Sequence, residues 1–366
     1  MHDILTEKKL KRILMINFGG IGDEILFYPV IESLRSQYPE AHLSILVEPR
    51  CRNLLEHHYY LDSVLTFDIK HRKSPADLLE LLNLIREAAP ELVVSSGGSS
   101  MVAPLLFLSG APYRAGYDSG RFPGLLTHRA PLNQKQYAAQ MYYDLLLPLG
   151  FPEQPVTPQM SLPGVVKDWA STWLESQGLS DQRFVLIHPG VSLMSKEKNL
   201  IKSWARDNWL SLMQQLLDEG EHVVLAGGPD DAEEIDYLLP RLADHPHLHL
   251  AYGQTRDLYQ LGALIERSAS LICVDSAPMH LGVALNAPVV AIFGPTDDRL
   301  LLPPGEQLHL QAVTHPVACR PCLWATRNTT CDTLDCLVNI SVEQVYQALR
   351  QLMPVAVKES VSTSSC

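Results

Sequence analysis

The sequence predicts an α/β protein made of two Rossmann-like domains with a cleft between them. Strand-like apolar runs alternate with helical stretches in two series, and repeated βα units form parallel sheets that helices cover on both faces. A proline-rich stretch, with prolines at 148, 152, 155, 158 and 163, separates the series. The 366 residues suffice for two domains. We expect domains over 1–160 and 161–340, a terminal helix over 341–353 and a disordered tail over 354–366.

Apolar periodicity and turn residues place the individual elements. In the first series we expect strands at 13–18, 43–47, 64–67, 92–95 and 114–115, with helices near 23–37, 52–57, 75–88, 101–109 and 136–149. In the second we expect strands at 184–188, 222–226, 248–251, 270–274 and 289–293, with helices near 165–177, 206–219, 230–239, 257–266, 279–285 and 342–353. The uncharged run at 101–112 is too short to span a membrane and is expected to be a buried helix.

The composition is that of an ordinary globular chain and argues against several function classes. The chain is 46% hydrophobic and has a net charge of −12 with no basic block, so general nucleic-acid binding is not expected. The N-terminus lacks the apolar core of a signal peptide, and no uncharged apolar run reaches about 18 residues. We therefore expect a cytoplasmic protein, with peripheral contact to the inner membrane left open.

The most informative motif is Gly19-Gly20-Ile21-Gly22-Asp23, between a predicted strand and a predicted helix. Strand, glycine turn and helix open a Rossmann-like unit, but the dinucleotide fingerprint G-x-G-x-x-G is absent, which argues against a nicotinamide oxidoreductase. A carboxylate at a helix N-terminus would repel a phosphate bound there. We therefore interpret Asp23 as a base held over a cleft, and a plain N-cap is the alternative.

In the second half, four segments follow predicted strands, at the sheet edge where ligands of open α/β sheets bind. They are His188-Pro189-Gly190 with the polar loop from Ser192 to Lys202, the glycine turn at 226–231, the segment at 275–280, and the turn at 293–297. The third carries the most chemistry, because small residues at a helix N-terminus let a diphosphate approach the backbone N–H groups. Asp275 either bonds sugar hydroxyls or caps the helix, and His280 is either a ligand contact or a structural histidine.

Four of the seven cysteines cluster as Cys319-x2-Cys322-x8-Cys331-x4-Cys336. The first pair has the spacing of metal ligands, whereas the second pair fits common zinc patterns poorly. Three interpretations stay open: a structural thiol cluster without a metal, a zinc site, and redox or disulfide chemistry.

Several segments carry a family resemblance. They are Gly20-Ile21-Gly22-Asp23 with Tyr28-Pro29, Leu125-Leu126-Thr127-His128-Arg129, Lys202-Ser203-Trp204 with Trp209, the stretch DSAPMHL at 275–281, the stretch APVVAIFGPT at 287–296, and Cys319-Arg320-Pro321-Cys322. Each is weak alone. Together, and in this order over nearly the whole chain, they resemble glycosyltransferase family 9, the ADP-heptose:lipopolysaccharide heptosyltransferases and their relatives.

The resemblance implies a GT-B fold and an inverting glycosyltransferase that uses a nucleotide-sugar donor. The implied reaction moves a sugar, with heptose from ADP-heptose as the first choice, onto a lipopolysaccharide-core or related glycan acceptor. We expect no cofactor and no metal, since a helix N-terminus and a lysine can stabilise the leaving diphosphate. A catalytically silent protein that binds nucleotide sugars or glycans is the alternative, and the joint presence of Asp23, Lys202 and Asp275 argues against it.

The resemblance also implies a role for each site residue. Asp23 is implied as the general base, Lys202 as the contact to the donor phosphate and ribose, and Asp275 as the residue that holds the donor sugar. The remaining implied donor-binding residues are Ser192, Asp231, Ser276, Ala277 and His280. Three departures bear on sugar choice: Ala277 stands where the family usually has glycine, Asp231 is shorter than the acidic ribose contact expected there, and the loop at 190–202 is long.

Overall fold

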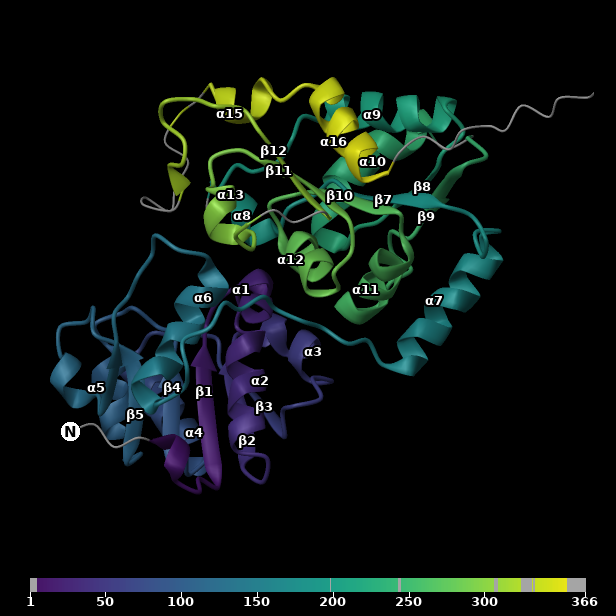
Figure 1. The fold of residues 1–366 in the computed structure, drawn as a ribbon. Helices are drawn as coiled ribbons and strands as arrows, with labels where there is room; N and C mark the ends of the chain where they lie inside the picture. The colour runs from purple at the N-terminus through teal and green to yellow at the C-terminus, as the bar shows by residue number, and fades with distance from the viewer. Residues whose placement is uncertain are drawn as a thin grey trace, which may run out of the picture.

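The computed structural model describes residues 5–197, 199–242, 245–305, 309–323, 331 and 333–353. In these residues the chain forms two six-stranded sheets, each with helices packed on it, one above the other in Figure 1. The predicted tail over 354–366 lies outside the described residues.

The first sheet has the strand order β3-β2-β1-β4-β5-β6, and every neighbouring pair is parallel. Its strands are β1 (Arg12–Asn17), β2 (His42–Val47), β3 (Ser63–Thr66), β4 (Leu92–Ser95), β5 (Tyr113–Tyr117) and β6 (His128–Ala130). The second sheet has the order β12-β11-β10-β7-β8-β9, again all parallel. Its strands are β7 (Phe184–His188), β8 (His222–Leu225), β9 (Leu248–Leu250), β10 (Ser270–Val274), β11 (Val289–Phe293) and β12 (Leu310–Thr314).

Both sheets therefore have the same doubly wound order, in which successive strands are first added on one side of the first strand of the sheet and then on its other side. The reversal of strand order lies between β1 and β4 in the first sheet and between β7 and β10 in the second. Ligands of such sheets bind outside the carboxyl ends of the strands at this point. The topology thus predicts a ligand site at the loops after β1, β4, β7 and β10.

The helices connect these strands. The first domain contains α1 (Ile21–Leu26), α2 (Tyr28–Gln37), α3 (Arg52–Leu55), α4 (Pro75–Glu87), α5 (Val102–Leu108) and α6 (Ala138–Tyr143). The second contains α7 (Gly164–Ser176), α8 (Leu193–Glu197), α9 (Arg206–Asp218), α10 (Ala232–Leu242), α11 (Leu258–Arg267), α12 (Ala277–Ala284), α13 (Asp298–Leu301), α15 (Asp335–Val338) and α16 (Val342–Leu352). Short 3-10 helices are η1 (Leu5–Glu7), η2 (Pro49–Cys51), η3 (Pro123–Leu125), η4 (Asp144–Leu149) and η5 (Pro229–Asp231).

The predicted strands are all present, but the structure differs from other expectations. The edge strands β6 and β12 were missed, because each is short or only partly buried. The helix expected over 23–37 is interrupted: Phe27 is both the C-cap of α1 and the N-cap of α2, and Pro29 follows at the start of α2, where its missing N–H costs nothing. The helix expected over 136–149 divides into α6 and the 3-10 helix η4.

The helix expected to be buried over 101–112 is also different in the structure. It is shorter, and Met101, Phe107 and Leu108 are more than half exposed. Only part of α5, including Ala103 and Leu106, packs into the core. Among the described residues, no helix combines the length and the apolar character needed to cross a bilayer.

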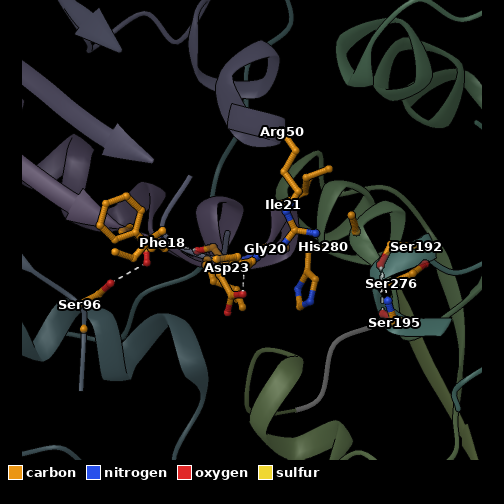
Figure 2. Close-up of a pocket in the computed structure, with 18 of the residues that line it drawn as sticks. Phe18, Gly20, Ile21, Asp23, Arg50, Ser96, Ser192, Ser195, Ser276 and His280 are labelled. Atoms are coloured by element: carbon orange, nitrogen blue, oxygen red, sulfur yellow. Dashed lines mark hydrogen bonds between the residues drawn. The ribbon is translucent and has the colours of Figure 1, made fainter. Parts of the chain in front are cut away.

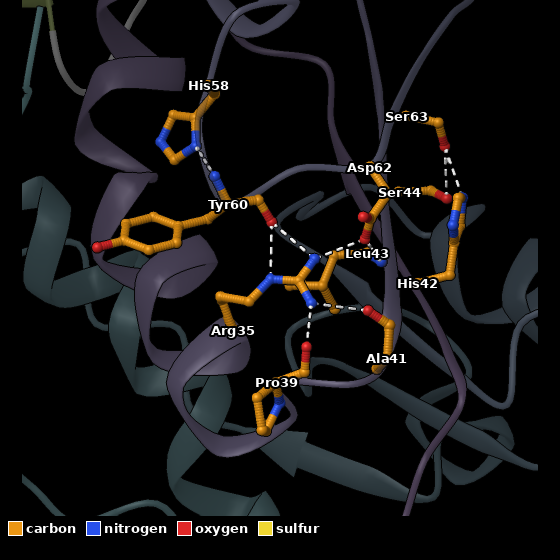
Figure 3. A network of polar contacts seen from close by, with 10 residues as sticks. All are labelled: Arg35, Pro39, Ala41, His42, Leu43, Ser44, His58, Tyr60, Asp62 and Ser63. Carbon is orange, nitrogen blue, oxygen red and sulfur yellow. Dashed lines mark hydrogen bonds and ion pairs between the residues drawn. The ribbon is translucent and has the colours of Figure 1, made fainter.

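A polar network fastens α2 to the edge of the first sheet (Figure 3). The Arg35 guanidinium donates to the carbonyl oxygens of Pro39, Ala41 and Tyr60, the last at 3.0 and 3.1 Å. It also pairs with Asp62 at 2.5 Å, and Asp62 in turn accepts from a backbone N–H of β2. One side chain thereby provides hydrogen bonds to backbone carbonyl oxygens in the turns that lead into β2 and β3.

The two domains are joined by residues 150–163, most of which form neither helix nor strand. We propose that the domain boundary lies in this segment, which contains the expected division at residue 160. The domains touch where α1 packs against α12. A second contact is the Tyr259 hydroxyl of α11, which donates to the Leu54 carbonyl oxygen of α3 at 2.9 Å.

Candidate active site

The main cleft lies between the two domains and has a volume of about 1650 Å³. Its walls come from the ends of β1 and β4 on one side and of β7, β8 and β10 on the other. The apolar side of α5 and of α4 extends the first wall outward. Figure 2 shows the first-domain residues Gly20, Asp23 and Arg50 facing the second-domain residues Ser192, Ser276 and His280.

Asp23 lies in the wall of this cleft with each carboxylate oxygen held by a donor. The Gly20 N–H donates to its Oδ2 at 2.6 Å, and the Tyr142 hydroxyl donates to its Oδ1 at 2.9 Å. Asp23 occupies the third position of α1, and Gly20 is the N-cap. The alternative interpretation, that Asp23 is the N-cap residue, is therefore wrong. Its Oδ2 does accept a hydrogen bond from the N–H of the actual N-cap, Gly20.

The glycines of this motif have packing roles. A Cβ at Gly19 would lie 2.3 Å from the Cβ of Asp23, so only glycine lets this side chain fold back over the turn. A Cβ at Gly22 would lie 2.6 Å from Cδ2 of His280, so this glycine lets α12 approach α1 across the domain interface. Close approach is a recognised use of glycine. At both positions the group that approaches the glycine is a side chain of this protein, Asp23 at Gly19 and His280 at Gly22.

Glu24, next to Asp23, is a second carboxyl group that the motif analysis did not single out. Its side chain is fully buried, and the Asn17 amide donates to its Oε2 at 3.1 Å. Burial, with the charge of Asp23 adding to it, raises the pKa of Glu24 well above its usual value. Of the two adjacent carboxyl groups, Asp23 is the one that lines the cleft.

Across the cleft, Asp275 and Lys202 form an ion pair at the end of β10. Lys202 Nζ lies 2.7 Å from Oδ2 of Asp275, and the aspartate side chain is only 4% exposed. Burial by itself would raise the pKa of Asp275, but the lysine charge outweighs it, so that the pKa lies below its usual value. The structure thus brings together two residues predicted separately from sequence, and Asp275 is not a helix cap.

The N-terminus of α12 carries Ser276, Ala277 and His280 into the same wall. Ser276 is the N-cap, but its hydroxyl donates back to the Val274 carbonyl oxygen at 3.3 Å instead of capping the first turn. Pro278 has no N–H and the Met279 N–H donates to the Ser276 carbonyl oxygen at 3.1 Å, so in the first turn of α12 the Ala277 N–H is the donor that an anion could use. His280 is 6% exposed, and burial lowers its pKa, which makes it neutral near pH 7.

Asp231 and Ser192 also reach the cleft, with different surroundings. The Asp231 carboxylate accepts from the Gly228 N–H at 2.7 Å and lies 3.4 Å from Nε2 of His188. A Cβ at Gly190 would lie 1.8 Å from Oδ1 of Asp231, so the aspartate fills the space above that glycine. Ser192 is exposed, and its hydroxyl lies 3.0 Å from that of Ser195.

The four clustered cysteines lie near one another, beside the loop that follows β11. Cys336 is buried, and burial together with the neighbouring thiols raises its pKa to about 11. The Cys322 N–H donates to the Pro295 carbonyl oxygen at 2.9 Å. Among the described residues, no group of three or more potential ligands has the arrangement of a metal site. Residues 324–330 and 332 lie outside the described residues, and the three interpretations of the cluster stay open.

Sequence reasoning placed His188 at a ligand-binding strand end, but it missed other residues that line the cleft, among them Arg50, Tyr142 and Arg256. Arg256 lies in the loop after β9, so its place beyond a strand end offered a signal. Arg50 and Tyr142 offered none, since their places depend on how η2 and α6 pack against the turn at Gly20 and Asp23.

Comparison with known proteins decides the family. The family model described as glycosyltransferase family 9 (heptosyltransferase) matches residues 79–330. The chain belongs to this family. It is 28% identical to lipopolysaccharide heptosyltransferase 3 of Escherichia coli over 288 residues, which cover 75% of this chain and 81% of that protein. It is 26% identical to lipopolysaccharide heptosyltransferase 2 of E. coli K12, over 78% of this chain and 83% of that protein.

Solved structures support the fold of this glycosyltransferase. The structure of E. coli ADP-heptose lps heptosyltransferase II matches with a TM-score of 0.73 at 23% identity, over 93% of this chain and 98% of that one. A glycosyltransferase family 9 structure from Veillonella parvula matches equally well, with a TM-score of 0.73 at 22% identity, over 94% and 97%. The chain therefore has the GT-B fold that its resemblance implied.

The Lys202–Asp275 ion pair generates a prediction on stability. Lys202→Ala leaves a buried aspartate without its partner, so we expect the free energy of unfolding to fall by about 3 kcal/mol. The double variant Lys202→Ala/Asp275→Asn should recover most of this loss. Urea unfolding followed by circular dichroism measures both.

The matched control is Lys167→Ala, which removes an exposed lysine from its 2.9 Å pair with Glu266. Such a surface pair contributes at most about 1 kcal/mol. Equal losses in the single and double variants would contradict the assigned role of the ion pair.

Proposed function

We propose that this glycosyltransferase moves heptose from ADP-heptose onto the core of lipopolysaccharide, with inversion at the anomeric carbon. One observation carries the proposal: a carboxylate of the first domain, Asp23, faces the uncapped N-terminus of α12 and the Lys202–Asp275 pair across a single cleft. The curated relatives are named lipopolysaccharide heptosyltransferases. One structure of similar fold is that of an E. coli heptosyltransferase with ADP-2-deoxy-2-fluoro heptose, at a TM-score of 0.67 and 17% identity.

On the donor side, the diphosphate is proposed to bind at Ser276 and Ala277, against the Ala277 N–H at the N-terminus of α12. The partial positive charge of the helix N-terminus favours an anion there, and Lys202 adds a full charge. Glycine would have no side chain at position 277, whereas the methyl group of Ala277 leaves the diphosphate less space to approach the backbone. Asp275 holds Lys202 in place and presents its remaining acceptor capacity to hydroxyls of the donor sugar, while Ser192 and Asp231 lie further along the same wall.

In the reaction, the acceptor hydroxyl oxygen attacks the anomeric carbon from the face opposite the diphosphate. The new glycosidic bond forms as the carbon–oxygen bond to the diphosphate breaks, and ADP leaves with that electron pair. The hydroxyl proton passes to the Asp23 carboxylate. Because His280 is neutral, the charge that stabilises the leaving group comes from Lys202 and the α12 N-terminus.

Peripheral contact with a membrane is the second part of the proposal. An apolar surface made of Leu78 and Leu79 of α4, Met101, and Leu108 of α5 is exposed and borders the mouth of the cleft. The Arg86 guanidinium donates to the Leu108 carbonyl oxygen at 2.8 Å and ties the two helices together at one end. We assign this surface to an anionic bilayer in which a glycolipid acceptor is embedded.

The distribution of charge supports that orientation. The first 160 residues contain 15 Lys and Arg against 17 Asp and Glu, whereas the remaining 206 contain 14 against 24. The half that carries the apolar surface is therefore almost neutral, and most of the net charge of −12 is on the other half. An anionic bilayer would repel the second domain and tolerate the first.

The proposed base predicts the behaviour of Asp23→Asn. The asparagine keeps the size of the side chain but accepts no proton, so we expect turnover to fall about 100-fold or more while ADP binding stays unchanged. ADP release from ADP-heptose, with de-acylated lipopolysaccharide core as acceptor, measures turnover, and calorimetry measures ADP binding. Turnover within a few-fold of the unmodified enzyme would leave Asp23 as a structural residue of α1.

The proposed donor site predicts the effect of Lys202 on ADP affinity. We expect Lys202→Ala/Asp275→Asn, the variant expected to remain stable, to bind ADP about 10-fold to 100-fold more weakly, as for the loss of a charge-assisted hydrogen bond. Calorimetry with ADP provides the measurement, and Lys167→Ala provides the control. Unchanged affinity in the double variant would remove Lys202 from the donor site.

The apolar surface predicts binding to vesicles of phosphatidylethanolamine and phosphatidylglycerol. We expect Leu79→Glu/Met101→Glu to weaken co-sedimentation about 10-fold or more, since each side chain loses the gain from burial in the bilayer. The control is Val165→Glu/Val338→Glu, which changes two side chains at least as exposed, on α7 and α15. Equal losses in both variants, or no binding by the unmodified protein, would contradict this surface.

A further inference from the structure

We infer that Tyr142 is a positioning residue for the Asp23 carboxylate: its hydroxyl sets the orientation in which the base meets the acceptor. This inference rests on the proposed role of Asp23. It is carried by the contact from the Tyr142 hydroxyl to Oδ1 of Asp23 at 2.9 Å, between residues 119 positions apart in the sequence.

The second bond to Asp23 shows why the tyrosine matters. The Gly20 N–H holds Oδ2 at 2.6 Å, and this bond alone would leave the carboxylate free to turn about that oxygen. The Tyr142 bond fixes the other oxygen. With both oxygens bonded, the plane of the carboxylate is set, and its remaining lone pairs have one orientation toward the cleft. A base held in this way needs no reorientation when the acceptor arrives.

Tyr142 is itself held firmly. Its side chain is 7% exposed, and its ring packs edge-on against Phe27 with 5.7 Å between the ring centroids. Phe27 is the residue at which α1 ends and α2 begins, so the break in this helix places an aromatic ring beside α6. The neighbouring Met141 carbonyl oxygen accepts from the Tyr117 hydroxyl of β5 at 2.8 Å. The tyrosine therefore stands on an element that is anchored to the sheet.

The hydroxyl remains a donor throughout the working pH range. Burial, together with the negative charge of Asp23, raises the pKa of Tyr142 well above its usual value. Tyr142 therefore takes no proton from the acceptor and gives none to Asp23 in the ground state. Its contribution is the direction and strength of one hydrogen bond to the base.

The test is a double-mutant cycle between Tyr142→Phe and Asp23→Asn. In the unmodified background, we expect Tyr142→Phe to lower kcat about 10-fold to 100-fold, the range associated with a misplaced catalytic group, with ADP affinity unchanged. In the Asp23→Asn background, the same change should alter kcat by no more than about two-fold, since a residue that acts through Asp23 has nothing left to orient. The assay is ADP release from ADP-heptose with de-acylated lipopolysaccharide core.

The matched control is Tyr143→Phe, the next residue on α6. Its hydroxyl donates to the Pro152 carbonyl oxygen at 3.0 Å and accepts from Gln154, with no contact to Asp23. Both variants remove one buried tyrosine hydroxyl from the same helix, so thermal melting should report similar losses of stability. We expect Tyr143→Phe to keep the kcat of the unmodified enzyme.

The outcomes separate this inference from the proposed function. A normal kcat for Tyr142→Phe, alongside a strong loss for Asp23→Asn, would overturn the inference and leave the base in place. Equal factors in both backgrounds would show that Tyr142 acts on the substrate or on the fold. A normal kcat for Asp23→Asn would overturn the proposed base itself.

Discussion

The packing of α1 against α12 is the contact on which the proposed site depends. It is possible because residue 22 is glycine: any side chain there would collide with His280, whose Cδ2 would lie 2.6 Å from a Cβ. Each helix begins just after a strand at the reversal point of its own sheet, β1 in one case and β10 in the other. Bringing these two helix N-termini together therefore sets the end of one sheet opposite the end of the other, with the cleft between them.

Burial and neighbouring charges shift the pKa values of the carboxyl groups around this cleft in opposite directions. Burial raises the pKa of Glu24 well above its usual value, whereas the pKa of Asp275, which is also buried, lies below its usual value because Lys202 lies 2.7 Å away. Asp23 lines the cleft and receives two hydrogen bonds, from a backbone N–H and a tyrosine. The opposed domains thus present a carboxylate on one side and, on the other, a lysine paired with Asp275 together with a helix N-terminus. This separation of charge suits a transfer in which a proton and a diphosphate leave in opposite directions.

Sequence reasoning was accurate where the signal was strong. The central strands are continuous apolar runs that are buried on both faces, so they were found within a residue or two. The strands β6 and β12 are short or only partly buried and carry polar residues, and they were missed. The apolar run of α5 was expected to be buried, and it is half exposed because α5 lies beside the mouth of the cleft. Hydrophobicity alone does not distinguish a core helix from a helix at a binding surface.

Two segments with the same sequence pattern show which features depend on local sequence and which depend on tertiary structure. Both Gly19–Asp23 and Gly227–Asp231 read Gly-Gly-x-x-Asp after a strand, and in both the aspartate accepts from the backbone N–H of the second glycine. The sequence by itself determined this local structure, since glycine turns, helix starts and capping bonds depend on neighbouring residues. Only the tertiary structure decided the difference between them. Both aspartates line the interdomain cleft, but Asp231 lies against Gly190 and His188 of its own domain, whereas Asp23 accepts a hydrogen bond from Tyr142. Such contacts between distant residues depend on how whole elements pack.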